Sequence, residues 1–557
     1  MKIDIQRIIF ILAIGIMIIL IAFPLALVFY KSFLRENTLS LVNYIDVFSE
    51  KNNYFPFLNT LKIGALTVIF ATAIGVILAW LVARTDIPFK GFLDTLLLVP
   101  YMIPPFIGAI AWTQLLSPRV GYINKIFMKI FDTSQGPFNI YSLMGIIWVM
   151  ALYNYPFVFI TVRGALERMD PSLEEAARIS GAGRFEVMKD ITLPLVVPAI
   201  VSGMLLVFVF TIANFGIPAI IGMRSRIYVL TTQIYRYLRM YTGGFAGVRL
   251  AAALSTLLMC VAGIAVFASN LSKKKYAIIV GKSVRPGIVE LGNWKYLILA
   301  ILSVFLLITL IAPLISIFIT SFLKAWGVPV KLENLSFKNY TYILFGYDYT
   351  RIAIKNSFLL AFSAAIITTI IGSIIAYISV KTEIKGRKIL DFLTTLPYSI
   401  PGTVVAIAMI LAWSGQFGVK LYYTFWIILV AYIARYMFFA FRNVSASLEQ
   451  IHSSLEEAAR VSGATWLQNF RDIVIPLIRP GLVASFLLVF MPTLRELTIS
   501  ILLVGPRTIT IGTAVYNLQE EGLYQITAAL SSLIIVILFI GNYLVRKVIN
   551  IKTTNSI

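Results

Sequence analysis

The strongest constraint on how this chain folds is a series of apolar stretches, each long enough to cross a lipid bilayer. A helix needs about 20 predominantly apolar residues to span a hydrocarbon core of roughly 30 Å. Hydrophobic residues make up 59% and charged residues 13% of the 557 residues, unlike the balance of a soluble protein. The sequence therefore predicts an all-α polytopic membrane protein with about twelve transmembrane helices. The windows lie near 8–30, 57–83, 92–116, 139–162, 193–221, 247–270, 294–322, 355–380, 390–413, 420–442, 474–504 and 525–545.

The first window follows only two basic residues, Lys2 and Arg7. It is too long for the core of a signal peptide, and no cleavage site of small residues follows it. We expect it to remain in the protein as a membrane helix.

Two segments of the chain are near copies of each other. LEEAARISGAGRFEVMKDITLPLVVPAI, from Leu173, matches LEEAARVSGATWLQNFRDIVIPLIRPGL, from Leu455, without a gap at an offset of 282 residues. Upstream, Pro100-Tyr101 matches Pro397-Tyr398 at an offset of 297. The first half must therefore carry 15 extra residues between these blocks, and we expect them in the outer loop around residues 117–139.

Each half holds an even number of predicted spans, so both halves enter the membrane in the same orientation. This indicates two parallel six-helix repeats, related by a pseudo-two-fold axis along the membrane normal, with a pathway between them. We expect the first repeat at 1–270, a basic cytoplasmic linker at 271–293, and the second repeat at 294–557.

The net charge of +22 has an explanation that does not involve nucleic acid. Lys and Arg collect in alternating loops, which by the positive-inside rule face the cytoplasm together with both termini. These loops contain Arg84 and Lys90, residues 163–189, Lys273 to Lys275, residues 381–388, and Arg546 with Lys547.

Several kinds of site are excluded by residue usage. Gly281-Lys282-Ser283 resembles the end of a phosphate-binding loop, but Tyr276 stands where that loop needs a glycine. Cys260 and His452 are the only residues of their types, which excludes zinc, haem and disulfide frameworks. We expect no cofactor, no metal site and no enzymatic activity, and the energy for any transport must come from elsewhere.

Each repeated segment is typical of a charged helix-turn-helix outside the membrane. In the first copy, Asp170 can cap a helix that begins at Pro171, and Ser172 with Glu175 offers an alternative capping box. Gly181 can take the left-handed conformation that ends this helix.

We expect a second short helix from about Arg184 to Ile191. Pro194 and Pro198 would then mark the return of the chain into the membrane.

The pattern E-E-A-A-R-x-S-G-A, followed by a hydrophobic–Pro pair, resembles the EAA loop of binding-protein-dependent ABC importer permeases. The resemblance covers loops at about 163–192 and 443–474, and it implies a fold like that of type I ABC importer permeases in the bacterial cytoplasmic membrane. In that family each loop docks into a cleft of one cytoplasmic ATPase subunit, so two copies of the ATPase and an extracytoplasmic substrate-binding protein are implied as partners.

The resemblance also implies which residues couple the chain to the ATPase. Small alanines would let the helix lie deep in a groove, while the glutamates would pair with basic groups of the ATPase. The coupling residues carried over are Glu174, Glu175, Ala176, Ala177, Gly181, Glu456, Glu457, Ala458, Ala459 and Gly463.

The substrate is indicated by resemblance alone. Residues 212–218, 228–235, 281–292 and 492–497 resemble the fused ferric-iron permeases. Fused permeases for thiamine or aminoethylphosphonate share the general plan and remain alternatives.

Polar groups within the predicted spans are candidates for the pathway, because burying them in a membrane is costly. Arg495 and Glu496 lie in the eleventh window, and Asn214 occupies the position equivalent to Glu496 at the 282-residue offset. Adjacent helical residues cannot point the same way, so one of the two would face the pathway or gate. For Arg495 the alternative is a side chain that snorkels or pairs with a neighbouring helix.

Other polar residues of the spans have a simpler interpretation. Arg435 is predicted to be an interfacial anchor near a span end. Tyr101, Tyr398 and Tyr432 either contribute oxygen atoms to the pathway or belong to interfacial belts.

Two other classes of protein fit less well. A secondary transporter would need an ion-coupling acid in the membrane, for which only Glu496 stands out, and it would leave the repeated loops unexplained. A membrane-embedded enzyme would need a nucleophile–base pair or a set of metal ligands, which the sequence does not offer.

Overall fold

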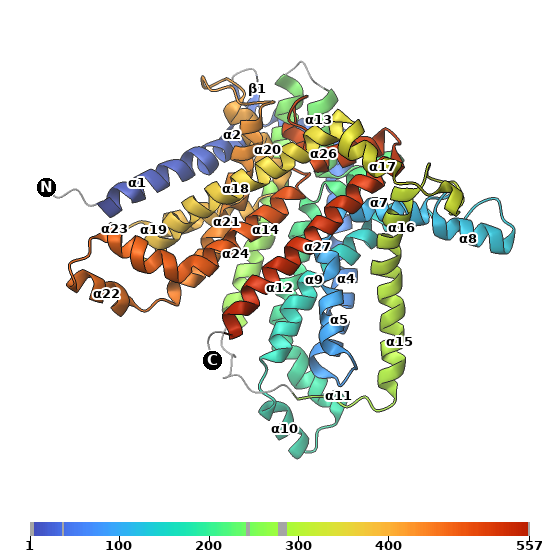
Figure 1. Ribbon diagram of the computed structural model, residues 1–557, viewed down its shortest axis with the longest axis horizontal. Helices are drawn as coiled ribbons and strands as arrows, with labels where there is room; N and C mark the ends of the chain where they lie inside the picture. The colour runs from blue at the N-terminus through green and yellow to red at the C-terminus, as the bar shows by residue number, and fades with distance from the viewer. Residues whose placement is uncertain (1–4, 36–37, 241–244, 277–286, 555–557) are drawn as a thin grey trace.

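The computed structural model describes residues 5–35, 38–240, 245–276 and 287–554, and it is built almost entirely of helices (Figure 1). The first half contains α1 (Ile5–Met17), η1 (Ile18–Ala22), α2 (Phe23–Ser32), β1 (Leu34–Arg35), β2 (Thr38–Leu39), α3 (Val42–Ser49), α4 (Lys51–Arg84), α5 (Lys90–Leu97), α6 (Val99–Met102), α7 (Pro105–Leu116), α8 (Tyr122–Phe131), α9 (Leu143–Glu167), α10 (Ser172–Ile179), α11 (Arg184–Val187), η2 (Met188–Thr192), α12 (Leu193–Ala213), η3 (Pro218–Gly222), η4 (Met223–Ser225), α13 (Leu230–Met240) and α14 (Phe245–Tyr276).

The second half repeats most of this order. It contains α15 (Trp294–Leu306), η5 (Leu307–Ile311), α16 (Ala312–Phe322), η6 (Leu332–Asn334), α17 (Lys338–Thr341), η7 (Tyr342–Gly346), α18 (Asp348–Lys381), α19 (Arg387–Ser399), α20 (Gly402–Trp413), α21 (Phe425–Glu449), α22 (Ser453–Val461), α23 (Trp466–Asn469), η8 (Phe470–Val474), α24 (Ile475–Leu494), α25 (Ser500–Leu503), α26 (Ile511–Glu520) and α27 (Tyr524–Thr554). β1 and β2 form a two-stranded antiparallel hairpin.

Among the described residues, ten helical segments are long and apolar enough to cross a membrane. Two further pairs pass the same test only together, because α5–α6 and α7 meet at 97° and α19 and α20 meet at 112°. The windows at 92–116 and 390–413 are therefore broken, whereas straight spans were expected. The breaks fall where Ile103 and Ile400 precede prolines, which disfavour helical angles in the preceding residue.

Two other windows end earlier than expected. α12 ends at Ala213 and α24 ends at Leu494, and each is followed by an irregular segment and then one helical turn, η3 or α25. Arg495 and Glu496 therefore lie beyond the end of the helix, which corrects the expectation that both are helical residues inside a span.

The two halves differ by an insertion in an outer loop. Residues 117–142, 26 in number, separate α7 from α9, whereas residues 414–424, 11 in number, separate α20 from α21. The difference of 15 residues is the one deduced from the offsets, and α8 lies within it. In Figure 1, α8 extends from the side of the molecule with no counterpart in the second half.

The halves are interlocked by their first spans. α2 packs on α14 of its own half and on α20 of the other half, and α16 likewise packs on both α27 and α7. Ser316 of α16 donates a hydrogen bond to the Ala111 carbonyl of α7 at 3.3 Å. The two repeats therefore form one body, with the broken helices α6–α7 and α19–α20 at their junction.

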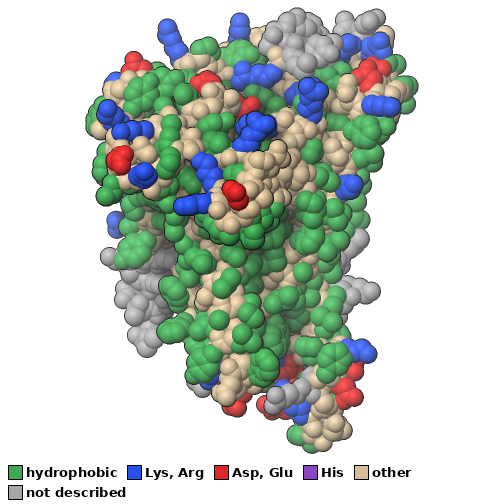
Figure 2. Space-filling model, turned by 90° about the vertical axis from the view of Figure 1, so that its right-hand side faces the viewer, with side chains coloured by type: hydrophobic (Ala, Val, Ile, Leu, Met, Phe, Trp, Pro, Cys, Tyr) green, Lys and Arg blue, Asp and Glu red, His purple; other side chains and the backbone are tan. Residues whose placement is uncertain are grey.

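Hydrophobic side chains cover the middle of the molecular surface seen in Figure 2, while Lys, Arg, Asp and Glu gather toward its two ends. Ile77 of α4 and Ile301 of α15 are about 60% exposed. Apolar side chains in this band are suited to contact lipid rather than water.

Glycines allow two pairs of long helices to approach closely at equivalent places. A Cβ atom at Gly75 of α4 would lie 2.7 Å from Val158 of α9, and one at Gly372 of α18 would lie 2.9 Å from Ala440 of α21. Small residues at such crossings are typical of helix packing in membranes.

Candidate functional site

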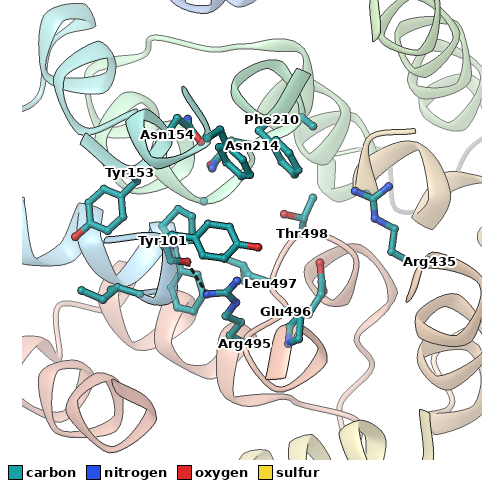
Figure 3. Close-up of a pocket in the computed structure, with 18 of the residues that line it drawn as sticks. Tyr101, Tyr153, Asn154, Phe210, Asn214, Arg435, Arg495, Glu496, Leu497 and Thr498 are labelled. Atoms are coloured by element: carbon teal, nitrogen blue, oxygen red, sulfur yellow. Dashed lines mark hydrogen bonds between the residues drawn. The ribbon is translucent and has the colours of Figure 1, made fainter. Parts of the chain in front are cut away.

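A cavity of about 240 Å³ lies at the junction of the two halves (Figure 3). Its walls come from the broken helices of both halves, from α9, α12 and α21, and from the segment after α24. The three candidate pathway residues line it together: Asn214, Arg495 and Glu496. Arg435, expected at an interface, also lines it.

Arg435 lies near the middle of α21 and satisfies the carbonyl groups left by the break between α19 and α20. Its Nη1 donates to the carbonyl of Tyr398 at 3.2 Å and also to those of Pro397 and Ile400. The final carbonyls of a helix have no intrahelical donor, and leaving them unpaired among apolar helices is costly. The prediction that Arg435 is an interfacial anchor is therefore wrong, because its guanidinium binds carbonyl groups inside the protein.

Arg495 binds the carbonyl groups left by the break between α6 and α7 in the first half. Its Nη1 donates to the carbonyls of Tyr101 and Met102, at the end of α6, at 3.0 and 2.7 Å. The side chain therefore crosses the junction and does not snorkel. At the positions equivalent to Arg435 and Arg495, the first half has Tyr153 and Ala213, so both capping arginines belong to the second half.

Glu496 and Asn214 occupy equivalent positions in the structure as well as in the sequence. The Glu496 carboxylate accepts hydrogen bonds from the N–H groups of Ile499 and Ser500 at 2.8 and 3.0 Å, and from the Ser500 hydroxyl at 2.8 Å. The Asn214 side-chain oxygen accepts one from the N–H of Ile217 at 3.0 Å. Asn214 thus caps the helical turn η3 that follows α12, and Glu496 caps the turn α25 that follows α24.

An aromatic wall joins the two halves beside these groups. Tyr101 meets the ring of Phe157 edge-on, Phe157 stacks on Phe210 at 4.4 Å between centroids, and Phe210 approaches Tyr398. Tyr101 and Tyr398 line the cavity. Tyr432 is instead fully buried, and its hydroxyl lies 2.5 Å from that of Ser500, so it belongs to neither an interfacial belt nor the cavity wall.

The repeated segments form the short helices α10 and α22, which lie at separate places on the surface, α10 at the bottom and α22 at the left of Figure 1. Asp170 accepts a hydrogen bond from the N–H of Ser172 at 2.9 Å, and this bond lowers the pKa of the Asp170 carboxyl. Gly181 and Gly463 have φ angles of +92° and +86°, in the left-handed region. The predicted end of the first helix is therefore confirmed, whereas the helix begins at Ser172, one residue later than predicted, with Pro171 as its N-cap.

The second helix of each motif does not stop before the membrane. α11, η2 and α12 run on without a break, as do α23, η8 and α24. The segment expected to end near Ile191 is therefore the first part of a span. A π-helical turn at residues 188–192 connects α11 to α12 without a break, and Pro194 lies in the first turn of α12.

The first glutamate of each motif points into the protein. Glu174 is buried, forms an ion pair with Arg84 of α4, and accepts a hydrogen bond from the Thr192 hydroxyl at 2.6 Å. These contacts tie α10 to the start of the following span. The expectation that this carboxylate reaches a partner protein is therefore wrong.

Glu456 repeats this arrangement in the second half. Its carboxylate lies 3.1 Å from the Lys381 ammonium and accepts hydrogen bonds from Tyr377 and Asn469 at 3.2 Å. Glu175 and Glu457 are the exposed members of the two pairs.

Sequence reasoning missed Arg84 and Lys381 as the partners of these glutamates. A signal was present, because the two residues are equivalent at the 297-residue offset and both are basic. In the sequence alone, both residues are part of the positive charge of their loops.

The described end of the linker is fixed to the first half. The N–H of Leu291 donates to Asp86 at 2.8 Å, which lowers the pKa of that carboxyl, and Val289 pairs with Thr85. Gly281-Lys282-Ser283 lies outside the described residues.

No group of three or more His, Cys, Asp or Glu side chains that could hold a metal ion occurs in the described part of the chain. The cavity is lined by one carboxylate, that of Glu496, together with arginine, tyrosine, amide and apolar side chains.

A duplicated bundle of membrane-crossing helices with a cavity at its junction defines a membrane-embedded transport protein. Residues 71–271 and 369–550 both match the family model described as "Binding-protein-dependent transport system inner membrane component". The chain belongs to this family and is a multi-pass permease of the ABC importer class.

Several relatives are similar over most of the chain, among them two permeases of ferric transport systems. The ferric transport system permease protein FbpB of Actinobacillus pleuropneumoniae is 28% identical over 93% of this chain and 74% of the relative. The putative ferric transport system permease protein FbpB 1 of Haemophilus influenzae is 30% identical over 88% of this chain and 76% of the relative. The solved structure of a bacterial ABC transporter that imports alginate matches 44% of this chain and 87% of its own, at 20% identity and a TM-score of 0.38.

Replacing Glu174 with Gln should destabilise the protein by about 3 kcal/mol, because the buried Arg84 guanidinium then loses its counter-charge. Thermal unfolding of the detergent-solubilised chain measures the effect. Glu175→Gln, on the exposed side of the same helix, is the matched control and should leave stability unchanged. Equal unfolding temperatures for the two variants would contradict the assignment of Glu174 as a structural anchor.

Proposed function

We propose that this chain forms the translocation pathway of a ferric-iron importer and couples it to ATP hydrolysis by two separate cytoplasmic ATPase subunits. The observation that carries the proposal is the presence of two equivalent surface helices, α10 and α22, each anchored to its own half by a buried glutamate. An extracytoplasmic binding protein delivers the cargo.

The outward surfaces of α10 and α22 suit a protein partner. Ile179 and Val461, at equivalent positions, are 88% and 90% exposed at the ends of these helices. Ala176 and Ala458 are exposed beside them and let another surface approach closely. Exposed apolar side chains on a charged segment are typical of protein–protein contact sites.

The remaining coupling residues have distinct roles in this proposal. Glu175 and Glu457 pair with basic groups of the ATPase, while Ala177 and Ala459 pack against the rest of the motif. Gly181 and Gly463 end the docking helices, and Glu174 and Glu456 transmit motion to the spans, because each helix is bonded to its span through them.

The contacts of Glu174 connect the docking helix α10 to α4 and to α12, which lines the cavity. Glu174 bonds both to Arg84, at the end of α4, and to Thr192, where α12 begins. α12 leads directly to Asn214 at the cavity. A displacement of α10 by the ATPase therefore acts on the helix that carries the cavity wall.

Ferric iron is the proposed cargo because relatives over most of the chain bear that name. Thiamine and aminoethylphosphonate are the alternatives. An ion-coupled secondary transporter is disfavoured, because the carboxylate of Glu496 is occupied as a helix cap.

We also propose how the chain is oriented in the membrane and where its two repeats begin and end. The protein lies in the bacterial cytoplasmic membrane with α10, α22 and both termini on the cytoplasmic side. The repeats span residues 1–270 and 294–557 around a linker at 271–293.

Replacing Ile179 and Val461 together with Asp should abolish co-purification of the ATPase, because two charges would have to be buried in the docking clefts. The variant should insert and unfold like the parent protein. Ile130→Asp, on the exposed outer helix α8, is the control and should retain the ATPase. Undiminished ATPase binding by the double variant would contradict docking through α10 and α22.

Uptake of radioactive iron into proteoliposomes tests the cargo and the energy source. Accumulation should require ATP, the ATPase and an iron-loaded binding protein, and it should persist when an uncoupler removes the proton gradient. Uptake by the chain alone under a proton gradient would overturn the importer mechanism. Uptake of thiamine or aminoethylphosphonate in place of iron would overturn the cargo only.

A further inference from the structure

The cavity carries more positive than negative charge. Arg435 and Arg495 line it and are half-buried, and among the described residues of its wall Glu496 is the single acidic one. Figure 3 shows the two arginines on different sides of the cavity, with Glu496 and Thr498 between them.

Both arginines keep donors that the fold does not use. Their hydrogen bonds to the helix carbonyls all run through Nη1. Within the described residues, no acceptor is bonded to the Nε or Nη2 groups of either side chain. An arginine presents five N–H donors in a fixed fork that matches carboxylate and phosphate oxygens. Each arginine can therefore bind an anion while it continues to cap its helix.

Glu496 offers little to a cation, because each of its carboxylate oxygens already accepts a hydrogen bond from a backbone N–H group. The carboxylate also accepts the Ser500 hydroxyl. A bare trivalent cation would have to displace these bonds and approach two guanidinium groups.

The broken helices add to the positive potential. α7 and α20 begin at Pro105 and Gly402, both of which line the cavity. The first N–H groups of a helix have no intrahelical acceptor and carry a partial positive charge; in α7 they begin with Phe106, because Pro105 has no N–H. Discontinuous membrane helices present such ends to anionic groups of a cargo.

We propose that this cavity binds an oxyanion, and that ferric iron therefore crosses the protein as a complex in which an oxyanion ligand lies between Arg435 and Arg495. The statement about iron rests on the proposed function, whereas the statement about the oxyanion rests on the cavity alone. The cavity volume is about 240 Å³. It suits a small oxyanion or a compact ferric complex.

Equilibrium binding to the purified full chain in detergent tests the inference with two probes, ³²P-phosphate alone and ferric citrate labelled with ⁵⁵Fe and ¹⁴C. We expect phosphate to bind, and we expect the two labels of ferric citrate to bind in a fixed ratio. Thr498→Glu places a negative charge in the cavity wall without removing either arginine cap. It should weaken binding of both probes at least about tenfold, because like charges in a partly buried site repel by more than 1.4 kcal/mol.

Thr133→Glu adds the same charge in an exposed outer loop and is the matched control. Arg495→Lys, which keeps the charge but loses the fork, should weaken binding less than Thr498→Glu does. Thermal unfolding of each variant verifies that it is folded.

The possible outcomes distinguish the oxyanion site from the assignment of ferric iron as the cargo. Phosphate binding that Thr498→Glu removes, without binding of ferric citrate, supports the oxyanion site and argues against iron as the cargo. Binding of ⁵⁵Fe without ¹⁴C, undiminished or strengthened by Thr498→Glu, supports iron and overturns the oxyanion site. Absence of binding by both probes to the folded parent chain also overturns it.

Discussion

The structure depends on how it satisfies the backbone at two helix breaks among apolar helices. A helix that ends away from water leaves carbonyl groups without donors, and each unpaired group costs several kcal/mol. Arg435 and Arg495 supply the missing donors for α19 and α6. Because Arg495 reaches from one half to the other, the cavity wall is complete only when both halves are in place.

Duplication followed by divergence explains why the charged groups are unevenly shared. The second half has Arg435, Arg495 and Glu496, where the first half has Tyr153, Ala213 and Asn214. Asn214 and Glu496 differ in charge but share the capping function, because each side chain accepts a hydrogen bond from the N–H group three residues further along the chain. Two repeats in one chain can therefore build a cavity that neither half could form alone.

The sequence was sufficient to predict the parts of the fold that are determined locally. The two offsets predicted the repeat and the 15-residue insertion, and Gly181 and Gly463 predicted the ends of α10 and α22. These features depend on glycine geometry and on chain register, both of which can be read without a partner.

Features that depend on contacts between distant segments were not predictable in the same way. Hydropathy windows average over about 20 residues, so they did not reveal the bends at Pro104 and Pro401. The position of Arg435 in the chain gave no indication that it serves carbonyls in α19, some 37 residues earlier. The inward direction of Glu174 likewise follows from Arg84 and Thr192, which are remote in sequence.

The two capping arginines, Arg435 and Arg495, should make the junction cavity electrostatically positive. The chain has a single cysteine, Cys260, so a Cys260→Ser background allows one reporter thiol to be placed at Thr498 in the cavity wall. The measurement is the rate of labelling of this thiol by an anionic and a cationic methanethiosulfonate of similar size, at low salt. We expect the anionic reagent to react several-fold faster than the cationic one, and Arg495→Gln to reduce this ratio of rates. Equal rates, or faster labelling by the cationic reagent, would contradict it.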